Sequence, residues 1–276
     1  MNHAMYVVAA SSNKVHQNDV VLQAFATGFG VEVQQDPSLA DIPPHATLVT
    51  FGVSCPNIRN LIKAHRARGG HWLETNNPWI KENNALARFA LNGLYPKRLP
   101  QLPETSPNPN ANPNPTGHIL ILPPTESVAD FVGINATEWL ENVLARCKGH
   151  TTIIRRHPND PLADPTQPAD VTEHIVGARA VVGFNSAVLV DECIKLGIPP
   201  VGDRLGSIIG TLRPFEPTRT RALSPRETQL LQTDLRKCQA SLAEIMTPGH
   251  IHTMLNFQRH ASSRQTQHRL TQLSGR

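Results

Sequence analysis

The 276-residue sequence lacks cysteine motifs and long apolar runs. Its four cysteines are widely spaced and form no Cys-x-x-Cys pair, which excludes the usual zinc and disulfide patterns and predicts buried free thiols. No stretch is long and apolar enough to span a membrane, and the apolar run near the N-terminus is too short for a signal peptide. We therefore expect a cytoplasmic protein without a membrane span.

Several enzyme motifs are also missing. No Gly-x-Gly-x-x-Gly segment follows the first apolar strand and no Gly-Lys-Ser/Thr loop occurs, which argues against dehydrogenases and nucleoside triphosphatases. The absence of a Gly-x-Ser-x-Gly elbow disfavours serine hydrolysis. Because no His-x-x-x-His pair or His/Asp cluster is present, we expect no metal site, and no motif predicts a bound cofactor.

The sequence has no dense run of lysine and arginine, although its formal net charge is +4. This modest excess suits a phosphate-bearing partner but does not identify nucleic acid. Basic residues of the first half would serve as phosphate contacts if DNA were bound, and otherwise form a solvated helix face. They are Lys63, Arg66, Arg68, Lys81, Lys97 and Arg98.

Short apolar runs alternate with amphipathic segments along the chain, which is typical of α/β domains. Residues 101–117 interrupt this pattern with interleaved proline and asparagine, so they predict an extended connector. The pattern then restarts, which favours two doubly wound domains that face a cleft. We predict a first domain at 1–100, the connector at 101–117, a second domain at 118–246, and a C-terminal helix with a polar tail at 247–276.

Particular segments carry that prediction. A strand is expected at 5–10 and a second, weaker one at 31–33, and Pro56 is expected to begin a helix. The apolar spacing within 135–148 predicts an amphipathic helix. Ser224 and Glu227 have the spacing of a capping box, and we expect the helix that follows them to reach Met246.

Two candidate sites in the first domain follow apolar strands. Ser11, Ser12 and Asn13 come after the first strand, where they would face a helix N-terminus and suit an anionic ligand or simply cap that helix. Glu74 is expected just beyond a strand that begins at His71. A carboxylate there can act as a general base if it faces a cleft, and is otherwise an ordinary surface glutamate.

Further polar residues follow the apolar strands of the second domain. Arg156 and His157 come after the strand at 151–154, and Thr125 lies in the loop after the strand at 118–122. Asn185 and Ser186 follow the next strand and precede a helix-like segment. Arginine, imidazole, hydroxyl and backbone N–H groups are donors for phosphate, so these residues predict a nucleotide-phosphate site.

The pairing of Arg156-His157-Pro158 with Phe184-Asn185-Ser186 resembles the His-Pro and serine motifs of bacterial GT-B glycosyltransferases. The similarity is greatest to the capsule-polysaccharide, Kdo-transferase and sialyltransferase-like group. It implies two Rossmann-like domains, with a nucleotide sugar as co-substrate whose phosphate contacts His157 and Ser186. It further implies that Glu74 deprotonates the acceptor and that His157 protonates the leaving group.

The first domain departs from the family pattern, because Glu74 stands where aspartate is usual and the expected following glycine is absent. Many similar sequences are phage-like, so the acceptor is expected to be a saccharide or a hydroxymethylated pyrimidine in DNA. Two alternatives remain open. The chain could be a nucleotide-binding module of GT-B shape without catalysis, or a sugar-nucleotide epimerase that needs no separate acceptor.

Overall fold

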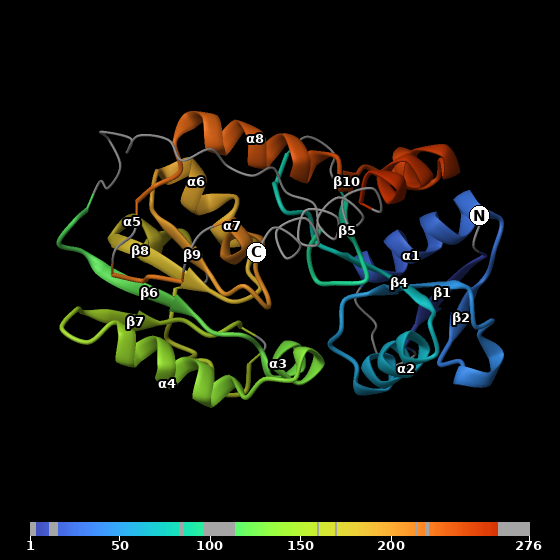
Figure 1. Ribbon diagram of the computed structural model, residues 1–276, viewed down its shortest axis with the longest axis horizontal. Helices are drawn as coiled ribbons and strands as arrows, with labels where there is room; N and C mark the ends of the chain where they lie inside the picture. Colours follow the sequence, from blue (N-terminus) through green and yellow to red (C-terminus); the bar gives the residue numbers. More distant parts are fainter. Residues whose placement is uncertain are drawn as a thin grey trace, which may run out of the picture. The chain divides into compact units, whose positions relative to one another are not determined.

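A computed structural model describes most of the chain and divides it into two compact units (Figure 1). Unit 1 combines residues 1–99 with 234–276, and unit 2 comprises residues 100–233. The structure describes residues 4–10, 16–82, 86–96, 114–158, 160–168, 170–212, 215–218 and 221–258.

Unit 1 is built on a six-stranded mixed sheet with the order β10-β5-β4-β3-β1-β2. Strands β2, β1, β3 and β4 are mutually parallel, whereas β5 runs antiparallel to both β4 and β10. Its strands are β1 (Met5–Ala9), β2 (Val33–Gln35), β3 (Thr47–Phe51), β4 (His71–Asn76), β5 (Ala87–Leu91) and β10 (Gln239–Ala240). Its helices are α1 (His16–Phe29), η1 (Leu39–Asp41), α2 (Pro56–Ala67), α9 (Leu242–Ile245) and a helix over 248–258.

Helices cover both faces of this sheet. Phe25 of α1 packs with Leu73, Phe89 and Leu255 in the core on one face. Helix α2 covers the other face with residues three and four positions apart, namely the buried Ile58, Leu61, Ile62 and His65. Both faces are therefore apolar, as a mainly parallel sheet requires.

Unit 2 is built on a four-stranded parallel sheet with the order β7-β6-β8-β9. Helix α4 packs Trp139, Leu140 and Val143 on one face, and α5 and α6 lie on the other (Figure 1). Its strands are β6 (His118–Leu122), β7 (Thr152–Ile154), β8 (Ala178–Gly183) and β9 (Pro200–Gly202). Its helices are α3 (Glu126–Val132), α4 (Ala136–Arg146), α5 (Thr172–Val176), η2 (Ala187–Leu189), α6 (Glu192–Leu196) and α7 (Ile208–Leu212), and α8 (Pro225–Arg236) leads back to unit 1.

The α/β class is therefore confirmed, together with the expected strand at β1 and helices α2 and α4. The weak strand expected at 31–33 occurs at Val33–Gln35. Strand β5 was not predicted, although Ala87–Leu91 is entirely buried.

The long helix expected from Ser224 to Met246 is wrong at its C-terminal end. The capping box is present, because Ser224 N–H donates to Glu227 and Glu227 N–H donates to the Ser224 hydroxyl. However, α8 ends at Arg236 and β10 pairs with β5. A second capping box, between Ser241 and Glu244, then starts α9.

The division into units also differs from the predicted domains. Residues 234–246 were assigned to the second domain, whereas they belong to unit 1, where β10 extends the sheet. Most of the proline-rich connector and the polar tail beyond Gln258 lie outside the described residues. Within the described part of the chain, the helices are too short or too polar to cross a bilayer.

Candidate functional site

The carboxyl edge of the unit 2 sheet contains a point where the chain reverses its direction of winding. From β6 the chain passes to β7 on one side, then crosses to β8 on the other side. The loops after β6 and β8 consequently diverge. In open α/β sheets, ligands bind in the crevice at such a switch point.

The structure brings the donor-site residues predicted from the sequence to this one edge. Thr125 follows β6, Arg156 and His157 follow β7, and Asn185 and Ser186 follow β8. Since β7, β6 and β8 are neighbouring parallel strands, their carboxyl ends lie beside one another. The sequence placed these residues after strands, and the strand order now places them on adjacent ones.

The two hydroxyl groups at this edge also cap short helices. The Ser186 hydroxyl accepts a bond from Val188 N–H at 3.3 Å, and the Thr125 hydroxyl accepts one from Val128 N–H at 3.4 Å. Each hydroxyl can still donate its own hydrogen to a ligand oxygen. The helix expected directly after Ser186 is divided, because η2 ends at Leu189 and α6 begins at Glu192.

The two arginines after β7 have different environments. Arg155 is buried and donates to the Pro168 carbonyl at 2.6 Å, so it ties the end of β7 to the following loop. Arg156 is partly exposed and forms an ion pair with Asp160 at 3.5 Å. His157 is exposed. Arg156 and His157 are therefore the hydrogen-bonding side chains of this loop that are exposed enough to meet a ligand.

Asn185 has an amide oxygen that is buried and has no hydrogen-bond partner among the residues that the structure describes. Buried carbonyl oxygens are usually satisfied, so this atom is suited to accept a bond from a ligand hydroxyl or N–H. The preceding Phe184 is held firmly. Its ring makes an edge contact with Trp139 at 5.9 Å, and a Cβ at Gly206 would lie 2.2 Å from it.

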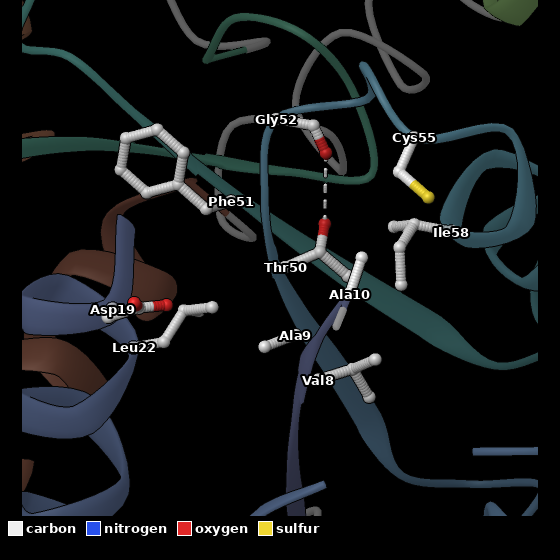
Figure 2. Close-up of a pocket in the computed structure, with 10 residues that line it drawn as sticks. All are labelled: Val8, Ala9, Ala10, Asp19, Leu22, Thr50, Phe51, Gly52, Cys55 and Ile58. Carbon is white, nitrogen blue, oxygen red and sulfur yellow. Dashed lines mark hydrogen bonds between the residues drawn. The ribbon is translucent and has the colours of Figure 1, made fainter. Parts of the chain in front are cut away.

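A pocket in unit 1 lies at the equivalent switch point, where β2 and β3 flank β1 on opposite sides. It encloses about 320 Å³, part of which is open to solvent. Figure 2 shows α1 residues approaching the strand ends from one side and α2 residues from the other. The lining residues are Val8, Ala9, Ala10, Asp19, Leu22, Thr50, Phe51, Gly52, Cys55 and Ile58.

Asp19 is a pocket residue that the sequence reasoning missed. It is exposed and belongs to the first turn of α1, and Figure 2 shows its carboxylate directed toward the strand ends. The missed signal was its position soon after the first strand. The acceptor-side residues predicted from the sequence, Ser11, Ser12 and Asn13, lie outside the described residues, although the preceding Ala10 lines the pocket.

Glu74 does not lie beyond a strand, as the sequence suggested, but within β4 and fully buried. Its Oε1 accepts a bond from the Asn76 amide at 3.0 Å and lies 3.8 Å from an Arg88 guanidinium nitrogen. Burial raises the pKa of this carboxyl, which Arg88 and Asn76 oppose. The strand is longer than expected because Leu73–Asn76 pair with the unpredicted β5.

Arg88 completes a buried polar cluster around Glu74. Its guanidinium carbon lies 3.6 Å from the Trp79 ring centre, and burial lowers the pKa of the group. Glu74 Oε2, Arg88 Nε and Trp79 Nε1 are buried without hydrogen-bond partners among the described residues. Glu74 is the β4 register partner of the pocket residue Thr50, yet the described pocket lining does not include it.

The basic residues considered for DNA contact are partly engaged within unit 1. Arg68 donates to the Leu39 and Ile42 carbonyls, so its guanidinium fastens α2 to the η1 segment. Lys97 and Arg98 lie outside the described residues. Lys63 and Arg66 lie exposed on α2, which is compatible with either of the two alternatives.

Potential metal ligands are dispersed over the described part of the chain. Among the described residues, no group of three or more histidine, cysteine, aspartate or glutamate side chains could hold a metal ion. Comparison with known proteins adds no family assignment: no family model matches the chain, and no curated protein matches it significantly.

Proposed function

We propose that this protein transfers a glycosyl group from a nucleotide-activated donor to a hydroxyl acceptor, with the donor phosphates bound by unit 2. The observation that carries the proposal is the convergence of Thr125, His157 and Ser186 on the carboxyl ends of three adjacent parallel strands. Hydroxyl and imidazole donors at one sheet edge suit phosphate oxygens, and Arg156 adds a positive charge beside His157.

The proposed reaction breaks the bond between the sugar anomeric carbon and the donor phosphate oxygen. The bonding electron pair stays on the phosphate, the acceptor oxygen forms the new bond to the anomeric carbon, and the acceptor proton passes to a base. His157 and Arg156 stabilise the negative charge that develops on the leaving phosphate. A protonated His157 can also donate its proton to that oxygen.

The strand orders of the two units support a GT-B arrangement of two Rossmann-like domains. Unit 1 contains β2-β1-β3-β4, and unit 2 contains β7-β6-β8-β9. In chain order within each unit, both are 2-1-3-4 sequences of parallel strands with a switch point beside the first strand. The proposal assigns the acceptor to the unit 1 pocket, where Asp19 supplies a carboxylate.

A saccharide acceptor suits unit 1 better than DNA does. Phosphate contacts require several available cations, whereas Arg68 is engaged with backbone carbonyls and the described pocket lining contains a carboxylate but no lysine or arginine.

One observation favours a second candidate, a nucleotide-binding module without catalysis. Glu74, the base implied by the family resemblance, is fully buried and paired with Arg88. A base must reach the hydroxyl from which it removes a proton, and a buried carboxylate in this position cannot do so. Donor binding without transfer or donor hydrolysis would support this candidate.

The proposal can be tested by calorimetric binding of a panel of nucleotides and nucleotide sugars to the full chain. We expect a donor to bind, and expect Ser186→Ala and His157→Ala to weaken binding by roughly 10- to 100-fold, the range for a lost hydrogen bond to a charged group. His150→Ala is the matched control, because His150 precedes β7 at the opposite edge of the sheet.

Ser186→Ala also removes a cap, so Ser241→Ala serves as a control for cap loss alone. Ser241 caps α9 in unit 1. If neither His157→Ala nor Ser186→Ala weakens binding of a nucleotide that the wild-type protein binds, the donor site has been assigned wrongly. If no nucleotide or nucleotide sugar binds, the proposed function itself is refuted.

A further inference from the structure

The segment between β7 and α5 returns to the end of the strand from which it leaves. Two side chains form hydrogen bonds across its base. Arg155 Nη1 donates to the Pro168 carbonyl at 2.6 Å, and Gln167 Nε2 donates to the Ile154 carbonyl at 3.0 Å. Because these two bonds fasten the beginning of the segment to its end, we call the described residues of 155–168 the closed loop.

Arg155 is buried, although arginine is mostly exposed in proteins unless it is paired. Its backbone N–H donates to the Ile121 carbonyl at 2.9 Å, which extends the pairing of β7 with β6. Its guanidinium also lies 3.5 Å from His174 Nδ1 of α5, and this nitrogen accepts because arginine can only donate. Arg155 therefore joins β6, α5 and the far end of the closed loop.

Asp160 organises the inside of the closed loop, and its side chain is only 4% exposed. One carboxylate oxygen forms the ion pair with Arg156 at 3.5 Å, and the other accepts from Leu162 N–H at 2.9 Å. Asp160 N–H donates to the His157 carbonyl at 2.8 Å. The side chain of Arg156 and the backbone of His157 are thus both connected to Asp160.

The closed loop separates residues that hold it in place from residues that face solvent. Arg155 is buried, whereas Arg156 is partly exposed and His157 is exposed. A phosphate that contacts Arg156 and His157 therefore meets side chains whose positions depend on the bonds beneath them.

Preorganisation connects these bonds to affinity. When only a fraction of the molecules has the binding-competent conformation, the apparent Kd rises by the inverse of that fraction. A loop that is already ordered also avoids the entropy cost of ordering when the ligand binds. Loss of the bonds at the base of the closed loop should therefore weaken binding without removing a group that touches the ligand.

We propose that Arg155 is a positioning residue of the donor site. By closing the loop at its base, it holds Arg156 and His157 in the arrangement that binds the donor phosphate, and it does not contact the donor itself. This inference rests on the proposed function and deepens it.

The experiment is calorimetric titration of the full chain with UDP, CDP, GDP, ADP and CMP, followed by titration of the variants with the nucleotide that binds most tightly. Arg155→Met should raise Kd by about 10-fold or more. Arg155→Lys should restore part of the affinity, because its ammonium can still donate to Pro168. Gln167→Leu breaks the second bond without changing a charge, and should weaken binding by a smaller factor.

A double-mutant cycle separates positioning from a general loss of stability. His157→Ala should weaken nucleotide binding fully in the wild type, but by at most about three-fold in Arg155→Met, because the imidazole is already displaced there. Ser186→Ala should weaken binding by the same factor in both backgrounds, since Ser186 belongs to the loop after β8.

Arg179→Met is the matched control for the loss of an engaged arginine. The Arg179 guanidinium also lies beside an imidazole, with His150 Nδ1 at 3.0 Å, and it donates to the Thr218 carbonyl at 3.3 Å. However, Arg179 lies near the beginning of β8, at the opposite edge of the same sheet. Its loss should lower the urea midpoint as Arg155→Met does, but leave nucleotide affinity unchanged.

Unchanged affinity in both Arg155→Met and Gln167→Leu would overturn the proposal. Equal losses of affinity in Arg155→Met and Arg179→Met, or a full effect of His157→Ala in Arg155→Met, would also overturn it. If Arg155→Met does not fold, the same cycle is measured with Gln167→Leu. In each case, weakened binding in Ser186→Ala leaves the proposed donor site standing. A wild-type protein that binds no nucleotide would refute both proposals.

Discussion

The buried pair of Glu74 and Arg88 is subject to opposing free-energy contributions. Burial penalises both charges, which raises the pKa of the Glu74 carboxyl and lowers that of the Arg88 guanidinium. Their attraction, the Asn76 hydrogen bond and the stacking on Trp79 oppose these penalties. Removing one partner leaves an uncompensated buried charge, whereas replacing both with apolar side chains removes both penalties.

Arg88→Met should therefore destabilise the protein by about 3–5 kcal/mol, as measured by urea unfolding. The double variant Glu74→Leu/Arg88→Met should be more stable than Arg88→Met alone, because no buried charge remains. If the double variant loses as much stability as Glu74→Leu and Arg88→Met lose together, the two residues act independently.

The raised pKa of Glu74 also predicts a pH dependence of stability. The folded state holds this proton more tightly than the unfolded state, whose value is near the ordinary 4.5. The resulting stabilisation is present below that value and is lost as the pH rises through the folded-state pKa. As the pH rises above the ordinary value of 4.5, the wild type should lose stability relative to Glu74→Gln in urea unfolding. Parallel profiles for the two proteins would contradict this.

At the scale of elements, a short strand and two glutamines complete the unit 1 sheet. Strand β10 pairs with β5, and the Gln239 side chain bonds both the N–H and the carbonyl of Ile80. Gln258 similarly accepts from Leu91 N–H and donates to the Phe89 carbonyl. These side-chain amides form hydrogen bonds with buried backbone groups that have no partner in the sheet.

Gln258→Leu should cost about 2–4 kcal/mol, since it leaves two buried backbone groups without partners at roughly 1–2 kcal/mol each. The measurement is the midpoint and slope of urea unfolding. Gln229→Leu, at an exposed position of α8, is the control and should change stability little. Equal effects of the two substitutions would show that the Gln258 bonds are not stabilising.

At the scale of the whole molecule, unit 1 is discontinuous in sequence, because it combines an N-terminal and a C-terminal segment of the chain. Its core contains Phe25 and Phe89 from the first segment together with Ile245, Ile251 and Leu255 from the second. A chain ending at Thr233 would expose the apolar surface that the second segment covers.

We expect the chain ending at Thr233 to be poorly soluble and to bind the dye 8-anilinonaphthalene-1-sulfonate strongly. A chain ending at Gln258 retains every described contact and should fold. Dye binding and circular dichroism compare the two. Native-like behaviour of the shorter chain would mean that the returning segment is dispensable.

Much of the fold was predictable from local patterns. The apolar spacing in α2 and α4, Pro56 at a helix start and the Ser224–Glu227 box each indicate one element and its boundary. The positions of the proposed donor-site residues at strand ends were predictable for the same reason, because each residue follows a recognisable strand. What placed them together was strand order, which is a non-local property.

The errors arose where long-range contacts override local pattern. The charge of Arg88 argues against a buried strand at Ala87–Leu91. The strand is nevertheless buried, because Glu74 on the neighbouring strand compensates that charge. Gln239–Ala240 becomes a strand by pairing with β5, over about 150 residues of sequence. Asp19 was missed because its only sequence signal is its position soon after the first strand, which many surface carboxylates share.

The pairing of β5 with β10 also bears on the order in which the chain can fold during synthesis. Residues 87–91 leave the ribosome long before residues 239–240, and the intervening unit 2 is complete by then. During that time the edge of β5 that later pairs with β10 is unpaired, while unit 2 can already form its own core. Unit 2 should become protease-resistant first on nascent chains, and chaperones that shield exposed strand edges should act on the first hundred residues.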